Sequence, residues 1–117
     1  MKKVLIVEDI PDHAFLIQHT LVNMAFLTFA CNNVFRALEM IRLKEFDLVI
    51  TDLKMPEMWG IDFIRYIRKF DLYIPIVVVT ASADIKTKSE ALEAGANFFI
   101  PKPFRKNDFD NVFNQFK

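Results

Sequence analysis

Short apolar runs separated by segments of helical periodicity recur along the chain, and this alternation limits the folds open to it. The apolar runs lie at residues 4–7, 26–31, 47–51, 76–79 and 98–100, and the helical segments lie at about 11–24, 32–44, 60–70, 84–94 and 105–116. A short apolar run bounded by polar residues predicts a buried strand. Strands alternating with helices in this way predict an α/β domain built on a five-stranded parallel sheet with five helices.

The order of the strands follows from the handedness of the connections. Right-handed crossovers place helices on both faces of a sheet only if the strand order reverses. A doubly wound, flavodoxin-like order, 2-1-3-4-5, has this reversal beside strands one and three. Pro101 cannot donate a backbone hydrogen bond, which agrees with a fifth strand at the edge. At 117 residues, we expect one domain over residues 1–117.

Charge and cysteine content exclude several classes of function. Fifteen basic and fifteen acidic side chains balance, so no net field favours nucleic acid or an anionic membrane. Cys31 is the single cysteine and cannot form an internal disulfide. No apolar stretch approaches the roughly 18 residues of a membrane span. We therefore expect a cytoplasmic protein that binds neither nucleic acid nor membrane directly.

Polar side chains follow four of the five apolar runs. Glu8 and Asp9 follow the first run, and Asp52 follows the third. Thr80 follows the fourth run, and Lys102 comes shortly after the fifth. Because the strands of a parallel sheet all end at the same edge, we expect these side chains to meet in the crevice where open α/β sheets bind ligands.

The chemistry of this set points to phosphoryl transfer. Three carboxylates in proximity repel one another unless a cation relieves them, and Mg²⁺ prefers oxygen ligands and phosphate oxygens. Lys102 and Thr80 would be superfluous for metal binding alone, but an ammonium and a hydroxyl suit an incoming phosphoryl group. Asp52 is then the nucleophile, which forms an acyl phosphate.

The same residues resemble a known family over almost the whole chain. The resemblance rests on Glu8-Asp9, Asp52-Leu53-Lys54-Met55-Pro56 with Gly60, Thr80-Ala81, and Lys102-Pro103-Phe104. These blocks are similar to the receiver domain of two-component response regulators, the CheY-like family. Its fold is the doubly wound sheet expected above.

The resemblance implies roles in phosphoryl and metal binding. Asp52 matches the phosphoacceptor, and Lys102 matches the phosphate-binding lysine, whose bond to the following proline is cis in the family. Asp9 matches the direct metal ligand, Glu8 a ligand acting through water, and the Lys54 backbone carbonyl a further ligand. The implied ion is Mg²⁺, which Mn²⁺ or Ca²⁺ can replace in crystals.

The resemblance also implies a phosphorylation-dependent switch. A histidine kinase or a histidine phosphotransfer protein donates the phosphoryl group to Asp52. Thr80 then moves toward this group, and Phe99 matches the aromatic residue whose rotamer reports activation. Phe99 lacks the hydroxyl that many members carry there, so its switching would depend on packing. The face formed by the fourth helix, fifth strand and fifth helix then changes its preference for partners.

The output and the oligomeric state are less constrained. The chain could act alone on a downstream protein target, or it could belong to a longer protein with an output domain. A homodimer through the face of the fourth helix, fifth strand and fifth helix is a further expectation. Ile85, Phe98 and Phe109 could supply apolar surface there.

Other functions fit the residues less well. An aspartate-nucleophile phosphatase needs a second acid two residues after Asp52, where Lys54 stands, so we expect no turnover of foreign substrates. A flavin-binding module needs a glycine- and hydroxyl-rich loop after the first strand, but that loop is acidic. A degenerate receiver would act only as a phosphorylation-independent docking module, against which the intact site argues. His13 and His19, on the first helix, are expected to face solvent. His13 starts this helix near the acidic residues, so a modest effect on the site is open, but we do not expect it to be a ligand.

Overall fold

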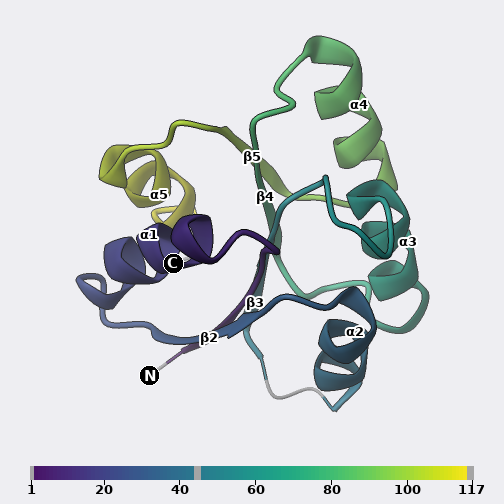
Figure 1. Cartoon of the computed structure of the whole chain (residues 1–117), viewed down its shortest axis with the longest axis horizontal. Coiled ribbons are helices and arrows are strands. Elements are labelled where there is room, and N and C mark those ends of the chain that lie inside the picture. Colours follow the sequence, from purple (N-terminus) through teal and green to yellow (C-terminus); the bar gives the residue numbers. More distant parts are fainter. Residues whose placement is uncertain (1, 44–45, 116–117) are drawn as a thin grey trace.

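The computed structural model describes residues 2–43 and 46–115, and it places a parallel sheet between two layers of helices (Figure 1). The elements in chain order are β1 (Lys3–Val7), α1 (Pro11–Val22), β2 (Leu27–Cys31), α2 (Val34–Arg42), β3 (Leu48–Thr51), α3 (Gly60–Phe70), β4 (Ile76–Thr80), α4 (Ile85–Ala94), β5 (Phe98–Pro101) and α5 (Lys106–Phe113). The predicted alternation of strands and helices is confirmed.

The sheet has the predicted order, β2-β1-β3-β4-β5, with every neighbouring pair parallel. The carboxyl ends of the central strands are in register, since Val7 lies beside Thr51 and Thr51 lies beside Val78. Pro101 ends the edge strand β5 and lies beside Thr80. The turns after β1, β3, β4 and β5 therefore open at one edge of the sheet.

Two hydrophobic cores form, one on each face of the sheet. Helices α2, α3 and α4 cover one face, while α1 and α5 cover the other (Figure 1). Along β1, Leu5 and Val7 belong to the first core, while Val4 and Ile6 belong to the second. Because both faces are covered, the strand reads as a continuous apolar run instead of an alternating one.

The structure corrects several predicted boundaries. Helix α1 ends at Val22, two residues before the predicted end, and Ala25 adopts a left-handed backbone with φ of 65°. This turn also delays the second strand to Leu27. Helices α2 and α5 end at Arg42 and Phe113, before the predicted ends near residue 44 and at Phe116, which themselves lie outside the described residues. Among the described residues, none of the helices is both long and apolar enough to cross a bilayer.

Candidate functional site

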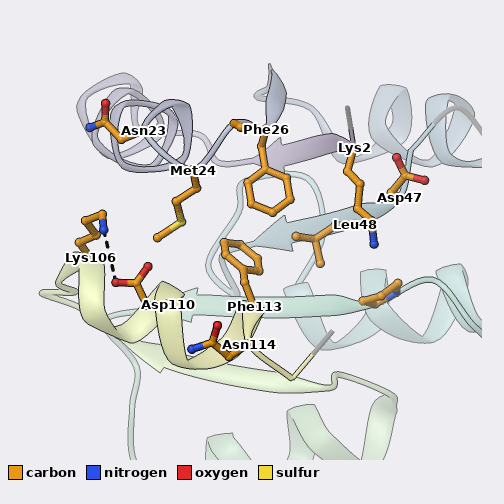
Figure 2. Close-up of a pocket in the computed structure, with 12 residues that line it drawn as sticks. Lys2, Asn23, Met24, Phe26, Asp47, Leu48, Lys106, Asp110, Phe113 and Asn114 are labelled. Atoms are coloured by element: carbon orange, nitrogen blue, oxygen red, sulfur yellow. Dashed lines mark hydrogen bonds and ion pairs between the residues drawn. The ribbon is translucent and has the colours of Figure 1, made fainter. Parts of the chain in front are cut away.

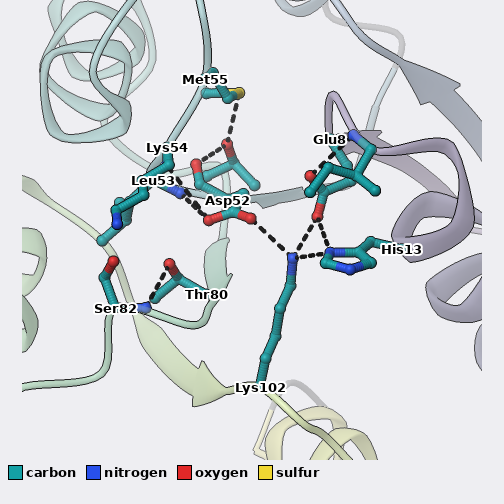
Figure 3. Close-up of polar contacts among 11 residues, drawn as sticks. Glu8, His13, Asp52, Leu53, Lys54, Met55, Thr80, Ser82 and Lys102 are labelled. Carbon is teal, nitrogen blue, oxygen red and sulfur yellow. Dashed lines mark hydrogen bonds and ion pairs between the residues drawn. The ribbon is translucent and has the colours of Figure 1, made fainter.

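The Lys102 ammonium lies at the centre of the site and is held by three side chains (Figure 3). Its Nζ atom donates to Glu8 Oε1 at 2.6 Å and to Asp52 Oδ2 at 2.8 Å. It also lies 2.7 Å from His13 Nδ1. The contact between Glu8 and Lys102 joins residues that are 94 positions apart in the sequence. The predicted convergence at the sheet edge therefore holds for Glu8, Asp52 and Lys102.

Asp52 is fixed by the backbone of its own loop. Its amide donates to the Val7 carbonyl at 3.2 Å, which continues the pairing of β3 with β1. Its Oδ1 atom accepts hydrogen bonds from the amides of Leu53 at 2.6 Å and Lys54 at 3.4 Å. The two carboxylate oxygens thus differ, because Oδ1 is held by amides and Oδ2 faces the ammonium of Lys102.

Gly60 lets the loop after Asp52 close tightly onto the start of α3. The Gly60 amide donates to the Leu53 carbonyl at 2.7 Å. A Cβ atom at residue 60 would collide with the Leu53 Cα and would lie 2.7 Å from the Asp52 carbonyl oxygen. Since these are backbone atoms that cannot move aside, the position requires glycine.

Glu8 enters the site from the end of β1. Its amide donates to the Cys31 carbonyl at 3.0 Å, and its Oε2 accepts from the Ile10 amide at 3.3 Å. The residue is only 3% exposed, so its carboxylate depends on Lys102 for charge compensation.

Lys102 and Thr80 are held side by side across the last pair of strands. The Lys102 amide donates to the Thr80 carbonyl at 2.9 Å, and the bond between Lys102 and Pro103 is cis, as the resemblance implies. Thr80 is 1% exposed, and its hydroxyl oxygen accepts from the Ser82 amide at 3.2 Å. Phe99, on β5, is partly buried against the core under α2, α3 and α4.

Burial works against charge at each of the three central groups, with different outcomes. Burial raises the pKa of Glu8 above its ordinary 4.5, and the hydrogen bond from Lys102 only partly offsets this. Burial also acts to raise the pKa of Asp52, but hydrogen bonding from Lys102 and Thr80 outweighs it and holds the pKa below 3.8. Burial acts to lower the pKa of Lys102, but bonding to Asp52 and Glu8 raises it above 10.5. Asp52 is therefore an ionised carboxylate near neutral pH.

The residues fit a divalent cation next to this cluster. Within the described part of the chain, Asp9 Oδ1 is the one buried side-chain oxygen or nitrogen that has no hydrogen-bond partner. Buried polar atoms almost always have a partner, and a cation would supply one here. Asp9 and Glu8 both line a cavity of about 740 Å³ that extends toward α1 and Asn32. Carboxylate oxygens such as that of Asp9 are the ligands that Mg²⁺ prefers.

His13 makes contacts in the site that the sequence did not predict. Its side chain is 38% exposed, but its ring also lies 3.7 Å from Glu8 Oε1 and contacts the Lys102 ammonium (Figure 3). The ligand atoms of Glu8, His13 and Asp52 all lie within 4.8 Å of one another. Its place in the first turn of α1, five residues after Glu8, was the available signal.

A second cavity, of about 600 Å³, lies away from these residues (Figure 2). It opens beside Lys2, Asp47 and Pro75, which precede β1, β3 and β4, so it lies at the opposite edge of the sheet. Its polar lining includes the Lys106–Asp110 ion pair, at 3.4 Å. We assign it no part in the chemistry described above.

Comparison with known proteins agrees with this geometry. Residues 4–114 match the family described as the response regulator receiver domain. The chain is 33% identical to the chemotaxis protein CheY-3 of Vibrio cholerae over 120 residues, which cover 97% of this chain and 92% of that protein. It is 37% identical over 109 residues to the transcriptional regulatory protein ZraR of Klebsiella oxytoca, covering 93% of this chain but 24% of ZraR.

Solved structures show the same fold. The chemotaxis protein CheY4 of Vibrio cholerae superposes with a TM-score of 0.88 at 26% identity, over 98% of each chain. A putative response regulator from Chloroflexus aurantiacus superposes with a TM-score of 0.89 at 28% identity, over 97% of this chain and 95% of that one. The chain therefore belongs to the response regulator receiver domain family of two-component systems. It spans about a quarter of the length of the transcriptional regulators that it matches.

Proposed function

We propose that Asp52 accepts a phosphoryl group from a phosphohistidine of a histidine kinase or a histidine phosphotransfer protein. The observation that carries this proposal is the 2.8 Å contact between the Lys102 ammonium and Asp52 Oδ2. An oxygen of Asp52 attacks phosphorus, an acyl phosphate bond forms, and the bond from phosphorus to the donor's imidazole nitrogen breaks. The electron pair of that bond leaves with the imidazole, so the step needs no further reactant.

The chain's own residues prepare this step. Asp52 attacks as a carboxylate because its pKa is lowered, chiefly by Lys102 against the opposing effect of burial. The Lys102 ammonium neutralises negative charge on the phosphoryl oxygens, and the Thr80 hydroxyl donates a hydrogen bond to one of them. Lys54 occupies the position where a phosphatase would carry its second acid, which supports a phosphoacceptor without turnover of foreign substrates.

Mg²⁺ is the proposed cofactor, with Mn²⁺ or Ca²⁺ as substitutes in crystals. Asp9, Asp52 and the Lys54 carbonyl would hold it directly, and Glu8 would bind through water. The partnerless Asp9 Oδ1 supports this assignment. When bound, the ion supplies positive charge that offsets the charge of the phosphoryl oxygens.

The phosphorylated state would be read on the face formed by α4, β5 and α5. Thr80 and Phe99 are the proposed switch residues. Thr80 hydrogen-bonds to Asp52, and Phe99 lies on β5 beside Val78 of β4. Ile85 is 89% exposed and is available to a downstream target, an output domain or a second copy of the chain. Phe109 does not take part, since it is fully buried in the core between α1 and α5.

We also propose one domain over residues 1–117, a cytoplasmic location, and no direct contact with nucleic acid or membrane. The balanced charge of the chain supports the last point.

The test is phosphorylation by a small donor. Wild-type protein is incubated with acetyl phosphate and Mg²⁺, and intact-mass spectrometry is expected to detect one added phosphoryl group. Asp52→Asn should show no gain, because it lacks the nucleophilic oxygen. Asp62→Asn, which changes an exposed carboxylate on α3, is the matched control and should gain the group like the wild type. An unchanged gain in Asp52→Asn would refute the assignment, and no gain in any protein would favour a docking module.

A further inference from the structure

The surroundings of the Lys102 ammonium are those of a small cation-binding site. Two carboxylate oxygens and one imidazole nitrogen lie 2.6 to 2.8 Å from its nitrogen. They come from three separate segments, namely the end of β1, the first turn of α1 and the end of β3. The His13 ring nitrogen makes this donor set different from the all-oxygen set of Asp9, Asp52 and the Lys54 carbonyl.

The charge of the cluster is not balanced by the ammonium. The side chains of Glu8 and Asp52 are 1% and 8% exposed, and they carry two negative charges when ionised. Lys102, whose side chain is 11% exposed, supplies one positive charge. Uncompensated charge in a buried place is unfavourable. A divalent cation in the same place would balance both carboxylates.

The donor set favours a transition metal over Mg²⁺. Zn²⁺ binds imidazole nitrogen and carboxylate oxygen at about 2.0 to 2.2 Å, commonly with three protein ligands and one open position. Imidazole suits Zn²⁺, whereas Mg²⁺ selects oxygen and keeps its waters. The ligand atoms of Glu8, His13 and Asp52 already lie within 4.8 Å of one another, so shifts of less than about an ångström would bring them into this range.

We propose that Glu8, His13 and Asp52 form a second cation site, selective for a borderline divalent metal such as Zn²⁺, whose occupation displaces Lys102 and blocks phosphorylation. The metal and the ammonium compete because they need the same three donor atoms. With the metal bound, Asp52 Oδ2 is a metal ligand and the Lys102 ammonium is pushed out by repulsion. The inhibitory half of this inference rests on the proposed function, while the metal site itself does not.

The binding test uses ZnCl₂ with the wild type, His13→Ala and His19→Ala. The chain has only two histidines, so imidazole ¹H–¹⁵N spectra separate the proposed ligand from an internal control. Zn²⁺ is expected to shift the His13 resonances and leave those of His19, which stacks on Phe15 further along α1, in place. Calorimetry measures the affinities for Zn²⁺ and Mg²⁺, and their ratio should fall at least about tenfold in His13→Ala. Loss of a residue that only supports a metal ligand already lowers metal affinity by about tenfold or more. The ratio should be unchanged in His19→Ala.

The inhibition test adds Zn²⁺ to the acetyl phosphate reaction at saturating Mg²⁺. Labelling of the wild type and of His19→Ala should fall as Zn²⁺ binds and return when a chelator is added. Zn²⁺ that binds without shifting His13, or with the same affinity ratio in His13→Ala, would overturn the site. Zn²⁺ bound at His13 without loss of labelling would overturn the competition. Failure of labelling with Mg²⁺ alone would instead count against the proposed function, and the spectra would still report on the metal site.

Discussion

Glu8 and Asp52 share one ammonium, yet the fold shifts their pKa values in opposite directions. The pKa of Glu8 is raised, because the effect of burial outweighs that of its hydrogen bond to Lys102. The pKa of Asp52 is lowered despite burial, because Lys102, Thr80 and the Leu53 amide all donate hydrogen bonds to its carboxylate. The protein therefore favours the ionised form of the proposed nucleophile and disfavours that of its neighbour. Since both groups touch the same ammonium, their protons come off as those of a coupled pair.

A stability measurement can test the raised pKa of Glu8. A carboxyl group whose folded-state pKa is raised stabilises the fold when protonated and loses that contribution as the pH rises through the folded-state pKa. Glu8→Gln mimics the protonated form, so it should be more stable than the wild type at pH 7 by urea unfolding. The difference should shrink as the pH falls toward the ordinary value of 4.5, where the wild type is protonated too.

The control for this prediction is Glu57→Gln, because residue 57 is exposed in the loop after β3. Its free energy of unfolding should follow the wild type at every pH. A Glu8→Gln protein that is less stable than the wild type at pH 7 would mean that the ion pair with Lys102 outweighs the cost of burial.

At the scale of elements, the N-terminus of α2 shows which of two adjacent asparagines acts as the cap. Asn32 and Asn33 both precede this helix, and asparagine is favoured at an N-cap. In the structure, Asn33 Oδ1 accepts from the amides of Phe35 at 2.9 Å and Arg36 at 3.0 Å. Asn33→Ala should therefore destabilise the protein by about 1 kcal/mol, a typical loss for a helix cap. Thermal or urea unfolding measures this loss.

Asn32→Ala is the matched control, since residue 32 is equally exposed and precedes the cap. Its stability should stay within about 0.5 kcal/mol of the wild type, as for ordinary surface changes. Equal losses in both variants would contradict the assignment of the cap to Asn33.

The first helix shows why the sequence predicted the fold better than the full site. Ala14, Ile17 and Leu21 repeat at helical spacing, and all three are buried. The same pattern places His13 outside this buried face, so it predicts a side chain that faces solvent. The pattern did not predict the contact of His13 with Lys102, which is 89 residues away in sequence. Local periodicity carries no information about a contact made by another loop.

At the scale of the whole molecule, the site depends on the reversal of strand order. Glu8, Asp52 and Lys102 follow β1, β3 and β5, and they meet because β1 and β3 are neighbours and β4 brings β5 alongside. The sequence predicted this much because each strand is a recognisable apolar run ending in a polar group. It did not predict the contacts within the cluster, since these depend on side-chain conformations that several elements set together.

We also expect that substitutions in the two cores change the free energy of unfolding independently, because the sheet lies between them. Ile67 on α3 and Ile17 on α1 are both buried, but they belong to cores on opposite faces. Each change to valine should cost about 0.5 to 1.5 kcal/mol, the usual range for loss of one buried methyl group. In the double variant the two losses should add to within about 0.5 kcal/mol, because the side chains share no neighbours across the sheet.

The control for this double variant is a second double variant whose two residues lie in the same core. Ile64 and Ile67 both lie in the core under α2, α3 and α4, one turn apart on α3. When both are changed to valine, the enlarged spaces adjoin and the core can relax around them together, so the losses should deviate from additivity by more than about 0.5 kcal/mol. Urea unfolding of the single and double variants measures both cycles. Coupling across the sheet as large as that within α3 would show that the strands transmit packing changes from one layer of helices to the other.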